Sequence, residues 1–366
     1  MLPALTAPSR GIPLTRLVAT ACLLVLFAGL ASAAKTLDIY FIDVEGGQST
    51  LIVTPAGQSM LIDAGYAARG GRGPRGTPPP PLAPGEPGRD PSRIVAVIRQ
   101  AGLQRLDYLL VTHYHPDHVG GVPEVVSQIP VGTFIDYGAP LDIDRMTAGG
   151  FRNYEPVRAT GLHLEARPGE RIPLKGIDAD IVSAGGALLS KPLPGGGVMN
   201  PACEGAEDHP EDGTENFRSV GVMFRFGAFR FLDLGDLSGN TLTALVCPRN
   251  LLGTASAYLI AHHGDYDSNV PALYAALRPR VAIMNNGLTR GGSPDAFKTL
   301  LGAKLEDLWQ LHRSGNPGAE NTADERIANI DEGATAFSLK LSANEDGSFA
   351  VTNLRTNVTK SYRRQR

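Results

Sequence analysis

Six consecutive residues, His113-Tyr114-His115-Pro116-Asp117-His118, constrain the fold of this chain more than any other feature. The chain has 8 histidines in 366 residues, and three of them lie in this segment beside an aspartate. The segment follows the leucine-rich and β-branched run 106–112, which is typical of a buried strand. We therefore expect an α/β protein that carries metal ligands where a strand ends.

The spacing of these ligands predicts two metal ions. Because side chains alternate along a strand, His113 and His115 project on one face and can bind one divalent ion. Pro116 turns the chain, so that Asp117 and His118 can bind a second ion. A mixed set of nitrogen and carboxylate ligands suits zinc or manganese. The alternative interpretation is a hydrogen-bonded histidine cluster that holds no metal.

Other candidate ligands also fall where predicted strands end. Asp63 closes one apolar run, Asp236 closes another, and the pair His262-His263 follows a third. Each alone is a weak signal, since an aspartate beside glycine is usually a turn former. Ends of neighbouring strands meet at one edge of a sheet, so together these residues predict a site shared with the histidine cluster.

The order of the elements predicts two sheets covered by helices. Gly 43 and Pro 28 imply many turns and exclude an all-helical bundle. Strands over 37–43, 49–53 and 59–63 predict an antiparallel meander at the start. Later strands occur in two batches with helices, which favours a layered α/β structure over a single wound sheet. The later helices are expected at 93–101, 122–128 and 270–277, and the strands at 106–112, 133–137, 220–226, 229–234, 258–261, 281–284, 336–341 and 349–353.

Two long segments interrupt this pattern. Residues 66–93 are rich in Arg, Gly and Pro and show no periodicity, so we expect a loop. It is either a solvated linker or a basic flap near an anionic substrate. Residues 195–215 form an acidic, Gly-rich insertion that contains Cys203. A disulfide from Cys203 to Cys247 would tie this insertion to the segment after Asp236; the alternative is two separate buried thiols.

The first 33 residues have the pattern of a cleaved secretory signal. Arg10 and Arg16 precede an apolar run from Leu17 to Leu30, and the small residues 31–33 supply a cleavage site. The apolar run has about 14 residues, whereas a membrane-spanning helix, the alternative, needs roughly 20. We therefore expect a leader at 1–33, a hydrolase domain at 34–366, and a secreted or periplasmic protein without a membrane segment in its mature form.

With these residues in order, the chain resembles the metallo-β-lactamase fold superfamily, whose motifs are a strand-end Asp, HxHxDH, a third His, a bridging Asp and a final His. Asp63, residues 113–118, Asp236 and the pair His262-His263 take the corresponding places. The resemblance implies a four-layer αββα sandwich and two divalent ions bridged by Asp236. It leaves open which of His262 and His263 binds metal, although the glycine after His263 is closer to the final motif. The other would support the ligands or donate a proton.

Within the superfamily, the chain looks most similar to the hydrolase domain of the competence protein ComEC and its free-standing relatives. Two departures stand out. In the usual opening motif DVGQGD, here at Asp43 to Gln48, Gly46 replaces the Gln and Gln48 replaces the second Asp. The third histidine is absent, and Asn216 lies near its place; His209 in the insertion is an alternative ligand. We therefore expect the ion at His113 and His115 to be held more weakly than its neighbour. The likeness rests on residues 41–49, Glu215-Asn216, Ser219-Val220, Gly235-Asp236 and His262-His263-Gly264.

The resemblance implies hydrolysis. Two ions bridged by Asp236 would lower the pKa of a shared water toward about 7, which makes hydroxide available as the nucleophile. Asp117 would orient this water, and no serine-hydrolase or Walker motif competes. The ComEC likeness favours a phosphodiester as substrate, while a lactone, a β-lactam or an envelope ester is the alternative. Nucleic acid has little support, because the chain has a net charge of −3 and only the arginines of 66–93 form a basic cluster.

A non-catalytic protein stabilised by metal is the second class of function. The absent third histidine and the altered opening motif favour it. Asp117 argues against it, because a purely structural site has no need for a residue that orients water. The residues expected to support the metal ligands are Asp43, Asp63 and Asn216.

Overall fold

The opening strands form the antiparallel meander that their alternating residues predict. In the computed structural model, β1 (Leu37–Phe41) pairs with β2 (Thr50–Val53), and β2 pairs with β3 (Ser59–Ile62). Residues 36–366 form one compact unit. The structure describes Met1 and residues 35–67, 88–140, 145–209, 213–268, 270–331 and 336–364.

The first sheet continues from the meander in both directions. Beyond β3, strands β4, β5 and β6 are parallel to one another, and the antiparallel strands β16, β17 and β18 extend the other side of β1. The order across the described strands is β18-β17-β16-β1-β2-β3-β4-β5-β6. The added strands are β4 (Leu106–Leu110), β5 (Val131–Asp136), β6 (Leu162–Glu165), β16 (Leu339–Ala343), β17 (Phe349–Asn353) and β18 (Val358–Tyr362).

The second sheet has the order β15-β14-β13-β12-β11-β10-β8-β7 among the described residues, with β9 paired to β8. Strands β11 to β15 are parallel, so their carboxyl ends lie at one edge. Its strands are β7 (Arg171–Ile172), β8 (Asp178–Ala184), β9 (Ala187–Leu188), β10 (Gly221–Phe226), β11 (Phe229–Asp233), β12 (Ala257–Leu259), β13 (Val281–Met284), β14 (Asp307–His312) and β15 (Ile327–Asn329).

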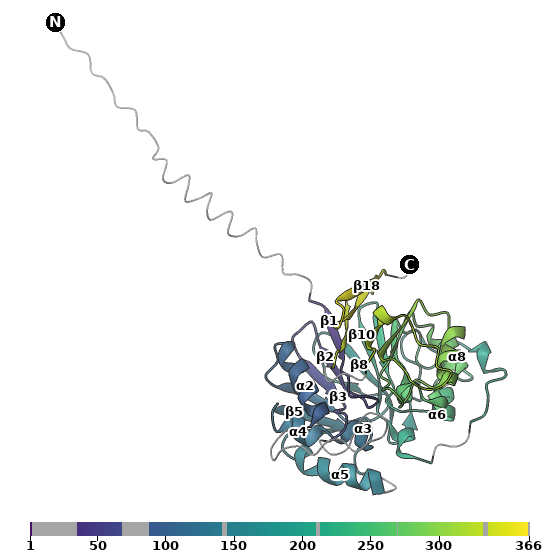
Figure 1. Ribbon diagram of the computed structural model, residues 1–366, viewed down its shortest axis with the longest axis horizontal. Helices are drawn as coiled ribbons and strands as arrows, with labels where there is room; N and C mark the ends of the chain where they lie inside the picture. The colour runs from purple at the N-terminus through teal and green to yellow at the C-terminus, as the bar shows by residue number, and fades with distance from the viewer. Residues whose placement is uncertain are drawn as a thin grey trace. The chain divides into compact units, whose positions relative to one another are not determined.

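The two sheets face each other, and helices cover their outer faces. Phe41 of the first sheet and Phe231 of the second meet with ring centroids 5.7 Å apart. Figure 1 shows α2, α4 and α5 on one side of the strands and α6 and α8 on the other. This is the expected four-layer αββα sandwich. The helices are α2 (Arg89–Gln100), α3 (Pro116–Val119), α4 (Val122–Val126), α5 (Arg145–Arg158), α6 (Gly239–Ala244), α7 (Pro271–Leu277) and α8 (Pro294–Gly302), and the 3-10 helices are η2 (Pro201–Cys203), η3 (Glu215–Arg218), η4 (Ala261–Gly264), η5 (Tyr266–Ser268) and η6 (Asp324–Arg326).

The prediction of a loop over 66–93 is wrong for its last residues. Helix α2 begins at Arg89, so that Arg89 and Arg93 are helical. They bind Glu45, and Arg93 also binds Asp43, which draws both arginines to the opening loop. Apolar residues at 94, 95 and 98 bury this helix against the first sheet. The rest of the proposed basic flap, at 68–87, lies outside the described residues.

Helix α5 was not expected from the sequence, because Gly149, Gly150 and Pro156 weaken any helical pattern. Gly150 has a packing role. A Cβ there would lie 2.2 Å from the carbonyl oxygen of Tyr114, so the absence of a side chain lets α5 approach the histidine segment. A tertiary contact thus requires a residue that local propensity disfavours.

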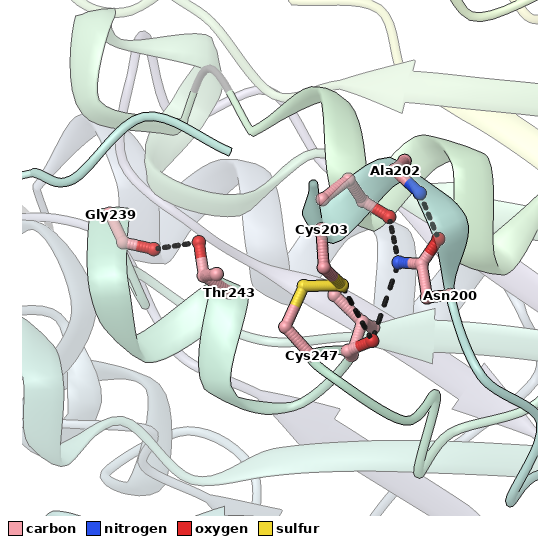
Figure 2. The surroundings of a disulfide bond; sticks show 8 residues. Asn200, Ala202, Cys203, Gly239, Thr243 and Cys247 are labelled. Carbon is pink, nitrogen blue, oxygen red and sulfur yellow. Dashed lines mark hydrogen bonds between the residues drawn. A yellow bond between two sulfur atoms is a disulfide. The ribbon is translucent and has the colours of Figure 1, made fainter. Parts of the chain in front are cut away.

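The predicted disulfide joins Cys203 to Cys247 (Figure 2). It links η2, inside the insertion 195–215, to the chain just after α6. Asn200 strengthens the same junction, since its amide donates to the carbonyl oxygens of Val246 and Ala272. Residues 210–212 of the insertion and residues 2–34, which include most of the expected leader 1–33, lie outside the described part of the chain. Among the described residues, no helix is long and apolar enough to cross a membrane.

Candidate metal centre

The histidine segment follows β4 as a loop that turns into a short helix. Strand β4 ends at Leu110, earlier than expected, so His113 and His115 do not project by strand alternation. His115 precedes α3, and Pro116 is its first residue, a position where proline is favoured. The rings of His113 and His115 still pack edge to face, 4.7 Å apart. Asp117 and His118 lie in the first turn of α3.

Asp236 is the centre of the cluster. Its Oδ2 lies 3.0 Å from Nε2 of His118 and 3.3 Å from Nε2 of His263. The same oxygen lies 3.8 Å from Nε2 of His262 and 3.9 Å from Nε2 of His113. One carboxylate oxygen is therefore shared by imidazoles from both sheets, which is the geometry of a bridging ligand.

The cluster fits a divalent ion, because its ligand atoms are close together and several of its buried polar atoms lack a hydrogen-bond partner. Asp117, His118, Asp236 and His263 each offer a ligand atom, and these atoms lie within 4.8 Å of one another. All four side chains are buried. Nε2 of His113, Oδ1 of Asp236 and both ring nitrogens of His263 are buried without a hydrogen-bond partner. Buried polar atoms are rarely left in this state unless an ion or water satisfies them, and nitrogen with carboxylate oxygen suits zinc.

His262 lies beside Asn216, near the position of the absent third histidine. Its Nε2 is 3.3 Å from the side-chain nitrogen of Asn216, the residue that stands in that histidine's place. Its Nδ1 lies 2.6 Å from Oδ1 of Asp267, an arrangement that fixes ring orientation in many metal sites. His113 and His262 thus approach the same oxygen of Asp236, at 3.9 and 3.8 Å, while His115 packs against His113. His209, the alternative ligand, lies instead beside Gly239, with its main chain bonded to Asn240.

The backbone at the histidine pair explains how both rings reach Asp236. After β12, His262 and His263 have φ values of 48° and 56°. This left-handed region is uncommon for residues other than glycine and costs of order 1 kcal/mol each. The tight turn lets both consecutive side chains approach one carboxylate oxygen. The structure therefore brings both members of the pair into the centre.

Asp63 supports the ligands without reaching the shared position. Its Oδ1 accepts from the main-chain N–H of Thr112, and its Oδ2 accepts from the Thr112 hydroxyl. Oδ2 also lies 2.7 Å from Nδ1 of His118. A carboxylate on the second ring nitrogen fixes the imidazole and turns Nε2 toward the ion. This is the supporting position expected for Asp63.

Charges in the cluster shift the pKa values of its members. Burial disfavours charge on His118, yet Asp236, Asp63 and Asp117 hold its pKa well above the usual value. Burial likewise opposes a charged Asp236, but His118, His263 and His262 hold its pKa well below its usual range. Against burial, Asp236 and Asp267 raise the pKa of His262 to about 9. Protons on these rings balance the carboxylates, so a divalent ion must displace protons when it binds.

The opening loop packs behind Asp117. The main-chain N–H of Gln48 donates to the Asp117 carbonyl oxygen, 3.1 Å away. The Gln48 side-chain amide donates to both carboxylate oxygens of Asp233, each at 3.1 Å, so glutamine suits this place better than the aspartate of the usual motif. Asp43 lies 2.6 Å from Nε2 of His312 and binds Arg93. The loop therefore positions the centre and does not join it.

Arg290 is a site residue that the sequence analysis missed. Its guanidinium forms an ion pair with Oδ2 of Asp117. Burial raises the pKa of Asp117, but this arginine, with His118 and His263, holds that pKa well below its usual range. A signal was present, since Arg290 is followed by Gly291-Gly292 shortly after the predicted strand 281–284. Polar residues beside glycines after a strand often form sites.

A separate cavity of about 900 Å³ lies between α7, α8 and the insertion. His209 lines it, together with basic residues that include Arg278, Lys298 and Lys304. None of the ligands around Asp236 takes part, so this cavity is distinct from the metal centre.

Comparison with known families agrees with this geometry. Residues 42–197 match the sequence profile of the metallo-beta-lactamase superfamily. The matched region includes Asp63 and the histidine segment. Asp236 and the pair His262-His263 lie beyond it and are joined to the centre by the structure.

Individual relatives are distant. A segment of 37 residues is 51% identical to hydroxyacylglutathione hydrolase of Aliivibrio salmonicida, but it spans only 10% of this chain and 14% of that enzyme. The metallo-beta-lactamase fold protein YhfI of Bacillus subtilis is 11% identical, with a TM-score of 0.41 over 75% of this chain and 95% of its own. A metallo-beta-lactamase of Cronobacter sakazakii is 15% identical, with a TM-score of 0.32 over 54% of this chain and 61% of its own.

Proposed function

We propose that this protein, whose residues 42–197 match the metallo-beta-lactamase superfamily, is an exported hydrolase that uses two divalent ions to cleave a phosphodiester. The observation that carries the proposal is the approach of four imidazole Nε2 atoms to Oδ2 of Asp236, between 3.0 and 3.9 Å. A carboxylate shared in this way suits a bridge between two ions.

The ligands divide into two sets around that bridge. Asp117, His118 and His263 would hold one ion with Asp236, and His113, His115 and His262 would hold the other. When bound, such ions lower the pKa of water toward about 7 and stabilise negative charge on a phosphoryl or carbonyl oxygen. Zinc fits these ligands best, and manganese is the second choice.

The protein's own groups would orient the reaction. Asp117 lies between Arg290 and the histidines, with its Oδ2 3.6 Å from Nε2 of His263, so it is suited to accept a hydrogen bond from the attacking water. Asp63 and Asp267 fix the rings of His118 and His262 through their Nδ1 atoms. A positioned base and preset ligands reduce the reorganisation needed in the transition state.

A phosphodiester is proposed as substrate on two grounds. The motifs before the hairpin and around the histidine pair are similar to those of ComEC-like hydrolases, and Arg290 adds a cation beside Asp117. Acyl compounds, namely a lactone, a β-lactam or an envelope ester, are the second candidate. The short match to hydroxyacylglutathione hydrolase favours that candidate, because the named enzyme acts on an acyl compound.

Metal content and turnover, measured on the same sample, test the proposal. We expect about two equivalents of zinc or manganese and hydrolysis of bis(p-nitrophenyl) phosphate that is lost on chelation and restored by metal. A panel with a lactone and a β-lactam separates the two candidate substrates. A tightly held ion with no turnover on any of them would instead support the non-catalytic metal-stabilised protein.

A further inference from the structure

Arg290 is a partly exposed arginine whose ion-pair partner, Asp117, is a buried candidate metal ligand. Its side chain is 41% exposed, while the Asp117 carboxylate that it contacts is only 4% exposed. The side chain therefore runs from the exposed surface to one of the four ligand residues described above. An arginine in this place can contact a substrate that approaches the centre from solvent.

Glycines on both sides fix the path of this arginine. A Cβ on Gly46, whose φ is +90°, would lie 2.7 Å from the Cβ of Arg290. A Cβ on Gly291 would lie 2.2 Å from the carbonyl oxygen of His263. The N–H of Gly287 donates to the Arg290 carbonyl oxygen, and that of Gly292 donates to His263. The stem thus lies pressed between the opening loop and the histidine turn, and a glutamine in place of Gly46 would clash with it.

Metal binding changes what Arg290 can contact. Asp117 Oδ2 is close to both His263 and Arg290, and a divalent ion held by this carboxylate competes directly with the guanidinium. Asp236 and Asp265 are the other carboxylates that act on Arg290, and Asp236 also faces the ions. If ions neutralised this carboxylate, the guanidinium would have donors free for another acceptor. Its planar fork suits two oxygens of one anionic group.

We propose that Arg290 is the substrate-recognition residue of this centre and binds an anionic oxygen next to the scissile bond, so that the enzyme selects anionic phosphodiesters over neutral esters. This inference rests on the proposed function, since it assigns the substrate class of the same site. It also gives a role to Gly46, which stands where the usual opening motif has glutamine.

Binding of inorganic phosphate tests the inference without turnover. Calorimetry on the zinc-loaded protein compares wild type with Arg290→Gln and with Arg171→Gln, whose arginine lies on the edge strand β7 and pairs with Asp178 and Asp180. We expect Arg290→Gln to weaken phosphate binding about tenfold to a hundredfold, as loss of a charged hydrogen bond does. Arg171→Gln should match wild type. Equal phosphate affinity in Arg290→Gln and wild type would overturn the inference.

Zinc affinity separates recognition from structural support. Arg290→Gln removes a competitor for Asp117, so zinc binding should be unchanged or tighter. If zinc affinity falls together with phosphate affinity, Arg290 supports the fold of the centre and the inference is wrong.

Turnover of matched substrates separates this inference from the proposed function. Arg290→Gln should lower kcat/KM for bis(p-nitrophenyl) phosphate about tenfold or more, while any hydrolysis of its neutral methyl triester falls less. An equal fall on both substrates would overturn the inference and leave the hydrolase proposal intact. Loss of phosphate binding in a protein that hydrolyses nothing would sink the proposed function and retain Arg290 as an anion-binding residue.

Discussion

At the scale of single residues, Asp236 is the residue that the two proposed ligand sets share. Its Oδ2 contacts His118 directly and lies near three further imidazoles, while its Oδ1 is buried without a partner. The two sets differ in exposure. His118 is fully buried and His263 is 1% exposed, whereas His115 is 8% exposed and the His262 side chain is 13% exposed. His115 and His262 are therefore the most exposed imidazoles around Asp236.

Asp117→Ala should abolish hydrolysis, because it removes a ligand and the acceptor that orients water. The expected cost in the activation barrier is several kcal/mol. Steady-state kinetics checks this, with Asp295→Ala at the exposed start of α8 as a control that should retain wild-type rates. In wild type, graded chelation should remove two ions in two steps, the first from the more exposed set. An active Asp117→Ala protein, or loss of both ions in one step, would contradict the assignment.

Variants of the histidine pair should each lose a different ion. His262→Ala removes a ligand from the set with His113 and His115, and His263→Ala removes one from the set with Asp117 and His118. Native mass spectrometry should find about one equivalent of zinc in His262→Ala, retained against mild chelation, because the four buried ligands remain. Two firmly held ions in His262→Ala would show that this histidine is not a ligand. Asn216→His, which restores the usual third histidine, should strengthen the weaker site.

At the scale of elements, the contact of Gln48 in the opening loop with Asp233 of β11 predicts that the stability of the fold depends on pH. Burial raises the pKa of Asp233 to about 7, whereas an unfolded aspartate titrates near 3.9. Between about pH 4 and 7 the folded protein binds a proton that the unfolded chain lacks, so this residue makes stability fall as pH rises through that window.

Asp233→Asn removes that titration. Relative to wild type, the variant should gain up to about 1.4 kcal/mol of unfolding free energy per pH unit across the window. Urea unfolding of the metal-loaded proteins at pH 5 and pH 8 measures the difference. A variant whose stability runs parallel to wild type at both pH values would show that Asp233 is ionised throughout.

The disulfide between η2 and the end of α6 is the second element-scale feature with a measurable effect. It closes a segment with a sequence separation of 44 residues. A crosslink of this kind restricts the unfolded chain and typically adds about 2–4 kcal/mol of stability. Cys203→Ser with Cys247→Ser should therefore lower the unfolding midpoint under oxidising conditions, while wild type treated with reductant should approach the variant. Two alkylatable thiols in non-reduced wild type would refute the bond.

For the whole molecule, the sequence predicts most of the fold and most of the side chains that gather around Asp236. It does not predict the contacts between segments that are distant in sequence. The strand meander, the two sheets and the disulfide follow from local patterns and spacing. Helix α5 does not, because Gly150 is selected by close approach to Tyr114. Arg290 and Asp233 were missed for the same reason: their roles arise from segments that are distant in sequence and carry no local period.

Export of the whole protein stays a prediction from the leader. The charged, apolar and small-residue order of residues 1–33 predicts cleavage after Ala33. Intact-mass measurement of the exported protein should therefore find a chain that begins at Ala34. An exported protein that begins at Met1 would contradict cleavage and favour a retained anchor.

Deep burial of the ligands governs where the ions are acquired. His113, His118 and Asp236 are fully buried, and Asp117 and His263 nearly so. Exchange at such a centre requires local opening of the structure, which is rarer the more stable the surrounding core. An ion captured while the chain folds is then retained afterwards. A metal acquired in this way would be determined by the ions present where the chain folds rather than by the relative affinities of competing metals.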